Sequence, residues 1–139
     1  MRRSAYTLVE VVIVVTIAGL VMMITVPRGR AVLDRIAVRA AAGDIISTLA
    51  TARMYALAGR SAVSIEVDSL TGVLRVKHGD EVLLTRNLGH AHGVRLAKSR
   101  DSLTYDGRGL GHGAANLSIV VRLRSAAETV FISRMGRVR

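Results

Sequence analysis

The hydrophobic and polar positions divide the chain into stretches with different periodicities. Residues 1–5 are polar and basic, and residues 8–26 are apolar apart from Glu10, two threonines and one glycine. As a helix this apolar run is about 28 Å long, close to the ~30 Å hydrocarbon core of a bilayer. Its aliphatic residues favour insertion and together outweigh one acidic residue near the end. The run therefore predicts a helix that spans a membrane.

A cleaved secretory signal and a buried core helix are the two alternatives for this run. A secretory signal ends a shorter apolar core with small residues in an A-x-A-like pattern, which does not follow here. A buried helix needs a large partner surface, which the rest of a 139-residue chain hardly supplies. We therefore prefer a membrane anchor over both alternatives. Arginines on both sides of the run leave its orientation open.

After Pro27 the helical periodicity continues without apolar saturation. Proline removes one amide donor, so we expect a kink at Pro27 but no end to the helix, which should run from about residue 6 to 58 with Gly59 as its C-cap. The predicted stripe that packs on the following domain is Leu33, Ile36, Ala40, Leu49, Ala52 and Ala56. A solvated or inter-subunit face is preferred over headgroup binding for Arg28, Arg30, Arg35 and Arg39.

From Ser61 onward the period changes to two, as in strands with one wet face. A turn is expected at 69–72, a hairpin signal at Gly79-Asp80 and a loop at 87–93. Short strands of this spacing predict an α+β fold, with the long N-terminal helix packed on a small antiparallel β-sheet or β-sandwich. The expected strands are 63–67, 73–78, 81–86, 94–97, 102–105, 117–123 and 129–133.

Charge and composition limit the chemistry. The net charge is +10, which favours nucleic acid, anionic lipid or an acidic protein as a partner. The absence of cysteine excludes a disulfide framework and a thiolate metal site.

The sequence contains few candidates for a chemical site. The glycine-rich stretch 106–113 precedes a strand, whereas a phosphate loop needs a helix after it, so a flexible connection is preferred. His90 and His92 lack a third ligand in an obvious pattern, so we read them as surface residues and predict no metal and no cofactor. No nucleophile–base–acid set is evident, and we predict no enzymatic activity.

Glu10 needs an explanation, because a carboxylate one turn into an apolar helix is costly. Either it snorkels to the headgroups and has no further role, or it meets a cation from a neighbouring chain. An amine freed by cleavage just before Tyr6 would be such a cation.

The residues around Glu10 resemble the signal of type IV pilins and pseudopilins, a small residue followed by Phe-Thr-Leu-Ile-Glu; here they read Ala5-Tyr6-Thr7-Leu8-Val9-Glu10. The resemblance implies prepilin peptidase cleavage between Ala5 and Tyr6, N-methylation of Tyr6, and a role for Glu10 in subunit assembly. Pro27 matches the proline that often closes the inserted half of the pilin helix. Alanine and tyrosine replace the usual glycine and phenylalanine, so slower processing is expected.

The second half of the chain is similar to the H-type minor pseudopilins, the GspH/FimT-like family. The likeness rests on Tyr105-Asp106-Gly107-Arg108-Gly109, an alternating strand, Val130-Phe131-Ile132-Ser133 and the terminal Gly136-Arg137-Val138-Arg139. In this family a pilin helix carries a small β-sandwich. Members of the FimT-like branch often carry a disulfide, which this chain cannot form.

The resemblance implies four segments: a leader (1–5), a transmembrane half of the helix (6–27), an amphipathic half (28–59) and a β-rich domain (60–139). The protein would be a single-pass protein of the bacterial inner membrane, with a cytoplasmic N-terminus and a periplasmic β-domain, and would join a filament. Other pilins or pseudopilins, a prepilin peptidase and inner-membrane lipid are the implied partners, with exported proteins or DNA as further candidates.

Two functions remain open. The first is a minor pseudopilin, a structural subunit of a type II secretion pseudopilus. The alternative is a minor type IV pilin that binds extracellular DNA through a basic tail containing Arg134, Arg137 and Arg139. We expect no aromatic beside this tail to stack bases, which argues against a dedicated platform for single strands. If the tail does not bind DNA, it is a solvated end or completes a strand. A third function, that of an anchored enzyme, is less favoured than these two because no site is evident.

Overall fold

The computed structural model describes residues 7–112, 116–133 and 137–138, and its longest element is helix α1 (Leu8–Gly59). Thr7 is the N-cap, because its Oγ1 accepts a hydrogen bond from the backbone N–H of Glu10 at 3.2 Å. The helix continues through Pro27, and its N-terminal part is long and apolar enough to cross a membrane by length and composition, with a mean hydropathy of 2.6. The chain forms two compact units, Met1–Leu33 and Asp34–Arg139.

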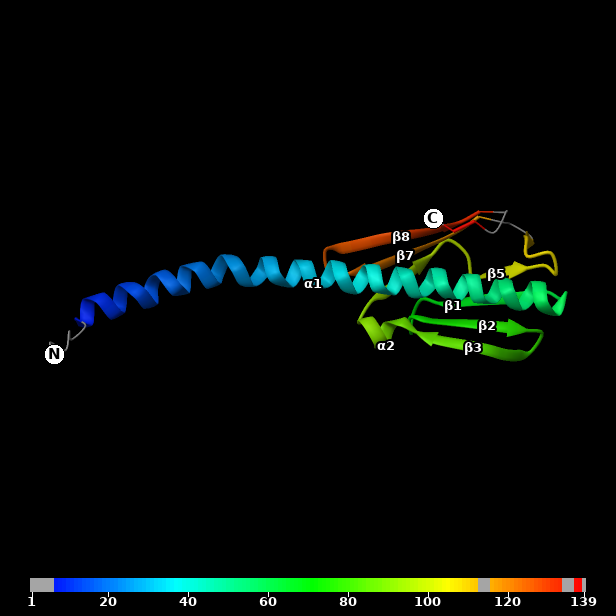
Figure 1. The fold of residues 1–139 in the computed structure, drawn as a ribbon, viewed down its shortest axis with the longest axis horizontal. Coiled ribbons are helices and arrows are strands. Elements are labelled where there is room, and N and C mark those ends of the chain that lie inside the picture. Colours follow the sequence, from blue (N-terminus) through cyan, green and yellow to red (C-terminus); the bar gives the residue numbers. More distant parts are fainter. Residues whose placement is uncertain (1–6, 113–115, 134–136, 139) are drawn as a thin grey trace. The chain divides into compact units, whose positions relative to one another are not determined.

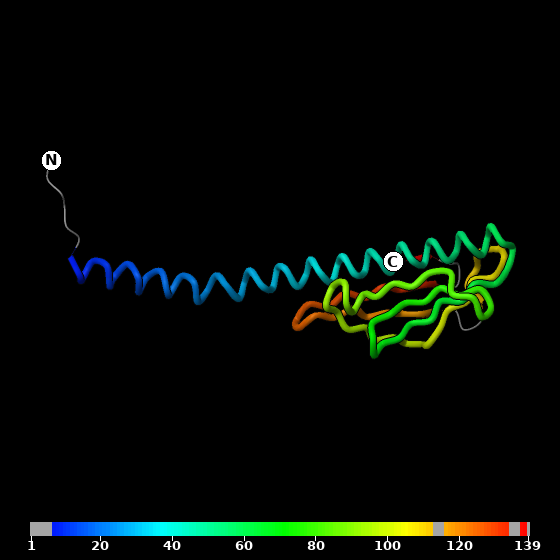
Figure 2. The backbone as a smooth tube through the Cα atoms, turned by 90° about the horizontal axis from the view of Figure 1, so that it is seen from below, coloured from blue at the N-terminus to red at the C-terminus, as the bar shows by residue number. Residues whose placement is uncertain are grey.

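The second unit contains two antiparallel sheets. The five-stranded sheet has the order β3-β2-β1-β5-β6, and the three-stranded sheet has the order β4-β7-β8. In this unit the strands lie on one side of the helix in Figure 2, whereas in Figure 1 they flank the helix above and below. The predicted α+β fold is confirmed. The strands are β1 (Val63–Asp68), β2 (Val73–His78), β3 (Glu81–Asn87), β4 (Arg95–Lys98), β5 (Ser102–Tyr105), β6 (Gly111–His112), β7 (Leu117–Leu123) and β8 (Ala126–Ile132).

A single core joins the helix to both sheets. The predicted helical stripe is wrong in its first three positions, since Leu33 and Ile36 are 66% and 58% exposed and Ala40 is exposed as well. Both apolar faces fit helical spacing, and only the position of the strands selects between them. Alanines on the buried face let the helix backbone lie close to the strands. That buried stripe is Val38, Ala41, Ala42, Ile45, Leu49, Ala52 and Ala56.

The C-terminal end of α1 is closed by a hydrogen-bonded reversal in which Arg60, rather than Gly59, takes a positive φ of 48°. The N–H of Ser61 donates to the carbonyl of Ala56 at 3.3 Å, and the N–H of Arg60 donates to that of Leu57 at 3.4 Å, as in a Schellman motif. Gly59 is therefore the last helical residue, and the left-handed position follows it.

Other differences from the sequence predictions are local. The expected loop at 87–93 contains the short helix α2 (Leu88–His92), in which the Asn87 side chain accepts from the N–H of His90 and Gly93 supplies a φ of 67°. Five helical residues are too few to produce a readable period. The last strand begins at Ala126, because a tight turn after Leu123 starts its pairing with β7 earlier than expected.

Gly107 allows the turn after β5 to pack against the end of the helix. A Cβ at this position would lie 2.6 Å from the carbonyl carbon and 2.7 Å from the carbonyl oxygen of Arg60. These are backbone atoms with little freedom to move, so any side chain here would force the two segments apart.

We expect Gly107→Ala to lower the free energy of unfolding by about 1–3 kcal/mol, because the added methyl overpacks a backbone contact. The control is Gly43→Ala, whose Cβ meets nothing within 4 Å. It should raise stability by about 0.5–1 kcal/mol through helix propensity. Thermal unfolding of the full chain in detergent micelles, followed by circular dichroism, measures both. Equal stability of the Gly107 variant and the wild type would contradict the close approach.

Candidate functional site

The N-terminal signal is only partly within the described residues, because Ala5 and Tyr6 lie outside them. Glu10 lies in the first turn of α1 and is exposed. Its backbone N–H is used by the Thr7 cap, while its carboxylate makes no hydrogen bond or ion pair with any described residue. The kink at Pro27 stays a prediction, as does the role of Glu10 in assembly.

The basic tail is described at Arg137 and Val138, whereas Arg134 and Arg139 lie outside the described residues. The chain turns back after β8, since the N–H of Ser133 donates to the carbonyl of Arg137 at 2.9 Å and the N–H of Arg137 donates to the Ser133 Oγ at 3.2 Å. Val138 then forms an antiparallel bridge with Ile132. The described part of the tail therefore pairs back against the end of β8 through one bridge, while the Arg137 side chain stays exposed.

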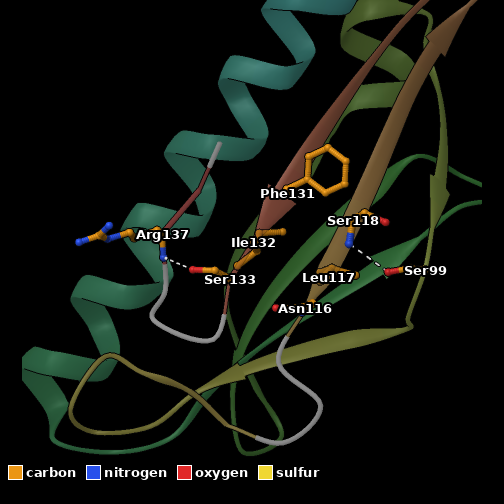
Figure 3. Close-up of a pocket in the computed structure, with 8 residues that line it drawn as sticks. All are labelled: Ser99, Asn116, Leu117, Ser118, Phe131, Ile132, Ser133 and Arg137. Atoms are coloured by element: carbon orange, nitrogen blue, oxygen red, sulfur yellow. Dashed lines mark hydrogen bonds between the residues drawn. The ribbon is translucent and has the colours of Figure 1, made fainter.

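A groove of about 800 Å³ lies beside this reversal, between the ends of β7 and β8 (Figure 3). Phe131 in the groove is 58% exposed, so an aromatic does accompany the tail in space, contrary to the expectation from sequence. The described lining contains hydroxyls but no histidine or carboxylate, so these residues offer binding contacts and no general base. The lining residues are Ser99, Asn116, Leu117, Ser118, Phe131, Ile132, Ser133 and Arg137.

The arginines of the C-terminal third do not form one patch. Arg137 follows the end of β8 that pairs with Leu117, whereas Arg122 and Arg124 lie at the opposite end of β7, where Leu123 pairs with Ala126. These ends are six residue steps apart along β7, or about 20 Å. Arg95 on β4 is the register partner of Arg122. Sequence reasoning missed this neighbour, because the two arginines lie far apart in the chain.

The glycine-rich stretch is an ordered turn rather than a flexible connection in its described residues, up to His112. The Asp106 carboxylate accepts from the N–H groups of Arg108 and Leu110, both at 2.9 Å. The bond from Leu110, followed by that from Arg108, holds the pKa of Asp106 below its ordinary value of 3.8. The carboxylate occupies the amides that an external phosphate would need, which also argues against a phosphate loop.

His92 is not a free surface residue as expected. Its Nε2 lies 2.8 Å from the Asp44 Oδ2, and since a carboxylate only accepts, Nε2 carries the proton. This bond joins α2 to the helix. His90 is exposed. Among the described residues no group of three or more His, Cys, Asp or Glu side chains is placed to hold a metal ion.

Comparison with known proteins identifies a family and a fold. A model of the family described as type II transport protein GspH matches residues 41–136. A crystal structure of the type IV minor pilin FimU from Pseudomonas aeruginosa PAO1 in space group P21 is 19% identical, with a TM-score of 0.63, over 73% of this chain and 86% of that one. A second FimU structure in space group P65 is 17% identical, with a TM-score of 0.60, over 73% and 90%. No curated protein matches the sequence.

Asp106→Ala should lower the melting temperature of the full chain at pH 7, because two turn amides lose their acceptor. A folded-state pKa below 3.8 means that the carboxylate stabilises the fold above about pH 4 and loses this effect as pH falls through the folded-state pKa. The difference in melting temperature from the wild type should therefore narrow on acidification. Asp80→Ala, which removes an exposed carboxylate without a described hydrogen bond, is the control. A difference that does not change with pH would refute this role of the charge.

Proposed function

Because the chain belongs to the GspH family of type II transport proteins, we propose that it is a minor pseudopilin, a structural subunit of a type II secretion pseudopilus that takes part in protein export across the outer membrane. The observation that carries this proposal is the combination within α1. Residues 8–26 are exposed and apolar apart from Glu10, two threonines and one glycine, whereas from Asp34 the same helix enters a closed core with both sheets. A membrane accounts for the first part, and the second part carries the family match.

The proposed processing, membrane insertion and assembly of the subunit follow from its N-terminal sequence. A prepilin peptidase removes residues 1–5 by cutting between Ala5 and Tyr6, and Tyr6 is then N-methylated. The subunit sits in the inner membrane with its N-terminus in the cytoplasm and its β-rich unit in the periplasm. On assembly, Glu10 pairs with the terminal amine of a neighbouring pseudopilin. This pairing is supported by the exposed carboxylate, which has no described partner within its own chain.

A structural role fits the second unit. The groove beside β8 and the turn at Asp106 present no base next to a nucleophile in their described residues. We therefore propose that the subunit contributes shape and contacts to the filament tip and performs no chemical step. Exported proteins are its proposed external partners.

DNA capture is a second candidate, favoured by one observation. The exposed Arg137 and the exposed Phe131 both line one groove, which therefore borders on a cation for a phosphate and a ring for a base, although the Arg137 side chain extends away from Phe131 (Figure 3). In this candidate the chain is a minor type IV pilin, and Arg134 and Arg139 add charge to the tail. The fold likeness to a type IV minor pilin is compatible with it.

The secretion role predicts a defined complementation pattern in the source bacterium. With the gene deleted, we expect loss of exported proteins from the medium, rescue by the wild type, and no rescue by Glu10→Gln, which cannot form the ion pair. Glu81→Gln, an exposed carboxylate on β3, should rescue fully. Intact mass of the rescued protein should show loss of residues 1–5 and one added methyl group. Unchanged export in the deletion strain, together with a chain that keeps its leader, would overturn the proposal.

The DNA candidate predicts salt-dependent binding by the full chain in nonionic detergent. Affinity for a short duplex should fall by about 0.9 log units per phosphate contact for each tenfold rise in salt. Arg134/Arg137/Arg139→Ala should weaken binding and reduce this slope, whereas Arg86→Ala on β3 should change neither. Phe131→Ala should weaken only single-strand binding, because stacking needs an unpaired base. No binding at low salt would eliminate this candidate.

A further inference from the structure

Two arginines oppose each other directly on the three-stranded sheet. Arg95 on β4 and Arg122 on β7 are register partners, and both are exposed. The next position across the sheet is Ala127 on β8, so this row contains no acidic residue. Like charges in direct cross-strand pairs destabilise a sheet. Neither arginine forms an ion pair or side-chain hydrogen bond with a described residue. The repulsion is therefore uncompensated within the described part of the chain.

A third arginine, Arg124, lies beside this pair and has an unfavourable backbone conformation. Arg124 is the first residue of the two-residue turn between β7 and β8, with a φ of 51°, where glycine is favoured. Its guanidinium lies 2.5 Å from Oδ1 of Asp34, whose side chain is only 9% exposed, while the Arg124 side chain remains 71% exposed. The buried carboxylate thus fixes the arginine, and most of its donors stay open to solvent.

The three arginines line one hollow. It has a volume of about 510 Å³, and all its charged lining residues are Arg95, Arg122 and Arg124, with Gly93 and Leu123 completing the described wall. A neighbouring hollow that contains Arg35 and Arg39 also contains Glu128, so its charge is partly compensated. Planar guanidinium groups match the oxygens of a phosphate. The first hollow is therefore suited to a phosphate group.

The chain itself limits where such a phosphate can come from. Asp34, which holds Arg124, comes eight residues after Val26, the end of the apolar run. Eight residues span at most about 29 Å even when fully extended, so the covalent chain keeps the hollow within reach of the surface that the anchor enters. Anionic headgroups attract basic residues at that surface within about one Debye length.

We propose that Arg95, Arg122 and Arg124 bind the phosphate groups of anionic phospholipids at the surface of the membrane that holds the chain's own anchor. The inference rests on the proposed function only in requiring that α1 is inserted. Headgroup binding at this site would orient the second unit on the membrane before the subunit is drawn into a filament. It differs from DNA capture, whose described residues Phe131 and Arg137 lie at the opposite end of the three-stranded sheet.

The absence of cysteine allows a clean optical test with the full chain in lipid nanodiscs. A donor fluorophore is attached at Ala97→Cys, an exposed position on β4 two residues from Arg95. Energy transfer is measured to headgroup-labelled phosphatidylglycerol or phosphatidylcholine at equal mole fraction. We expect about fivefold enrichment of phosphatidylglycerol near the donor in low salt. The enrichment should disappear in Arg95→Gln/Arg122→Gln, which breaks no described bond.

The matched control is Arg86→Gln/Arg108→Gln, which removes the same charge from exposed positions elsewhere. It should keep the enrichment. An equal loss in the control would show diffuse attraction and overturn the proposal, as would equal transfer to the two lipids. Displacement of the lipid by millimolar inorganic phosphate, or by a short DNA duplex at micromolar concentration, would assign the site to those ligands. Failure of the chain to enter nanodiscs would contradict the role of α1 as a membrane anchor, and with it the proposed function. It would not be evidence about phosphate binding in the hollow.

Discussion

The second unit depends on burial of one narrow stripe of α1. Val38, Ala41, Ile45, Leu49 and Ala52 are almost completely buried, and the residues on the inner faces of both sheets join them in one cluster. A five-stranded and a three-stranded sheet of this size bury little apolar surface without a third element, because each would have one open face. The helix supplies that element. The alanines in the stripe have small side chains, so the helix backbone lies close to the strands. At these positions the core is packed without bulky side chains.

Two contacts fix the helical part of this unit at its ends. At one end Asp34 pairs with Arg124 in the turn between β7 and β8. At the other end Arg60 reverses the chain, and Gly107 packs on its backbone. These contacts also determine where the exposed arginines and the exposed phenylalanine lie. The hollow with three arginines follows from the first contact, whereas the groove with Phe131 and Arg137 lies at the other end of the three-stranded sheet. The positive charge is thus divided between two sites with different neighbours.

The fold tolerates wide change in sequence. The fold likeness to the FimU minor pilin shows that this arrangement of helix and sheets is shared at 19% identity. A core of small apolar residues tolerates such sequence change when volume and patterning are kept.

The sequence by itself determined the long apolar helix, its continuation through Pro27 and the alternating strands, because these features depend on the local periods of 3.6 and 2. The signal around Glu10 and the family likeness were also readable from consecutive residues. The tertiary structure alone decided which helical face is buried, replacing Leu33 and Ile36 with Val38 and Ala41. It alone placed Arg95 beside Arg122 and Asp44 beside His92, and it alone showed that Phe131 and Arg137 line one groove. The two pairs depend on strand register and on packing between distant segments, which no local period records.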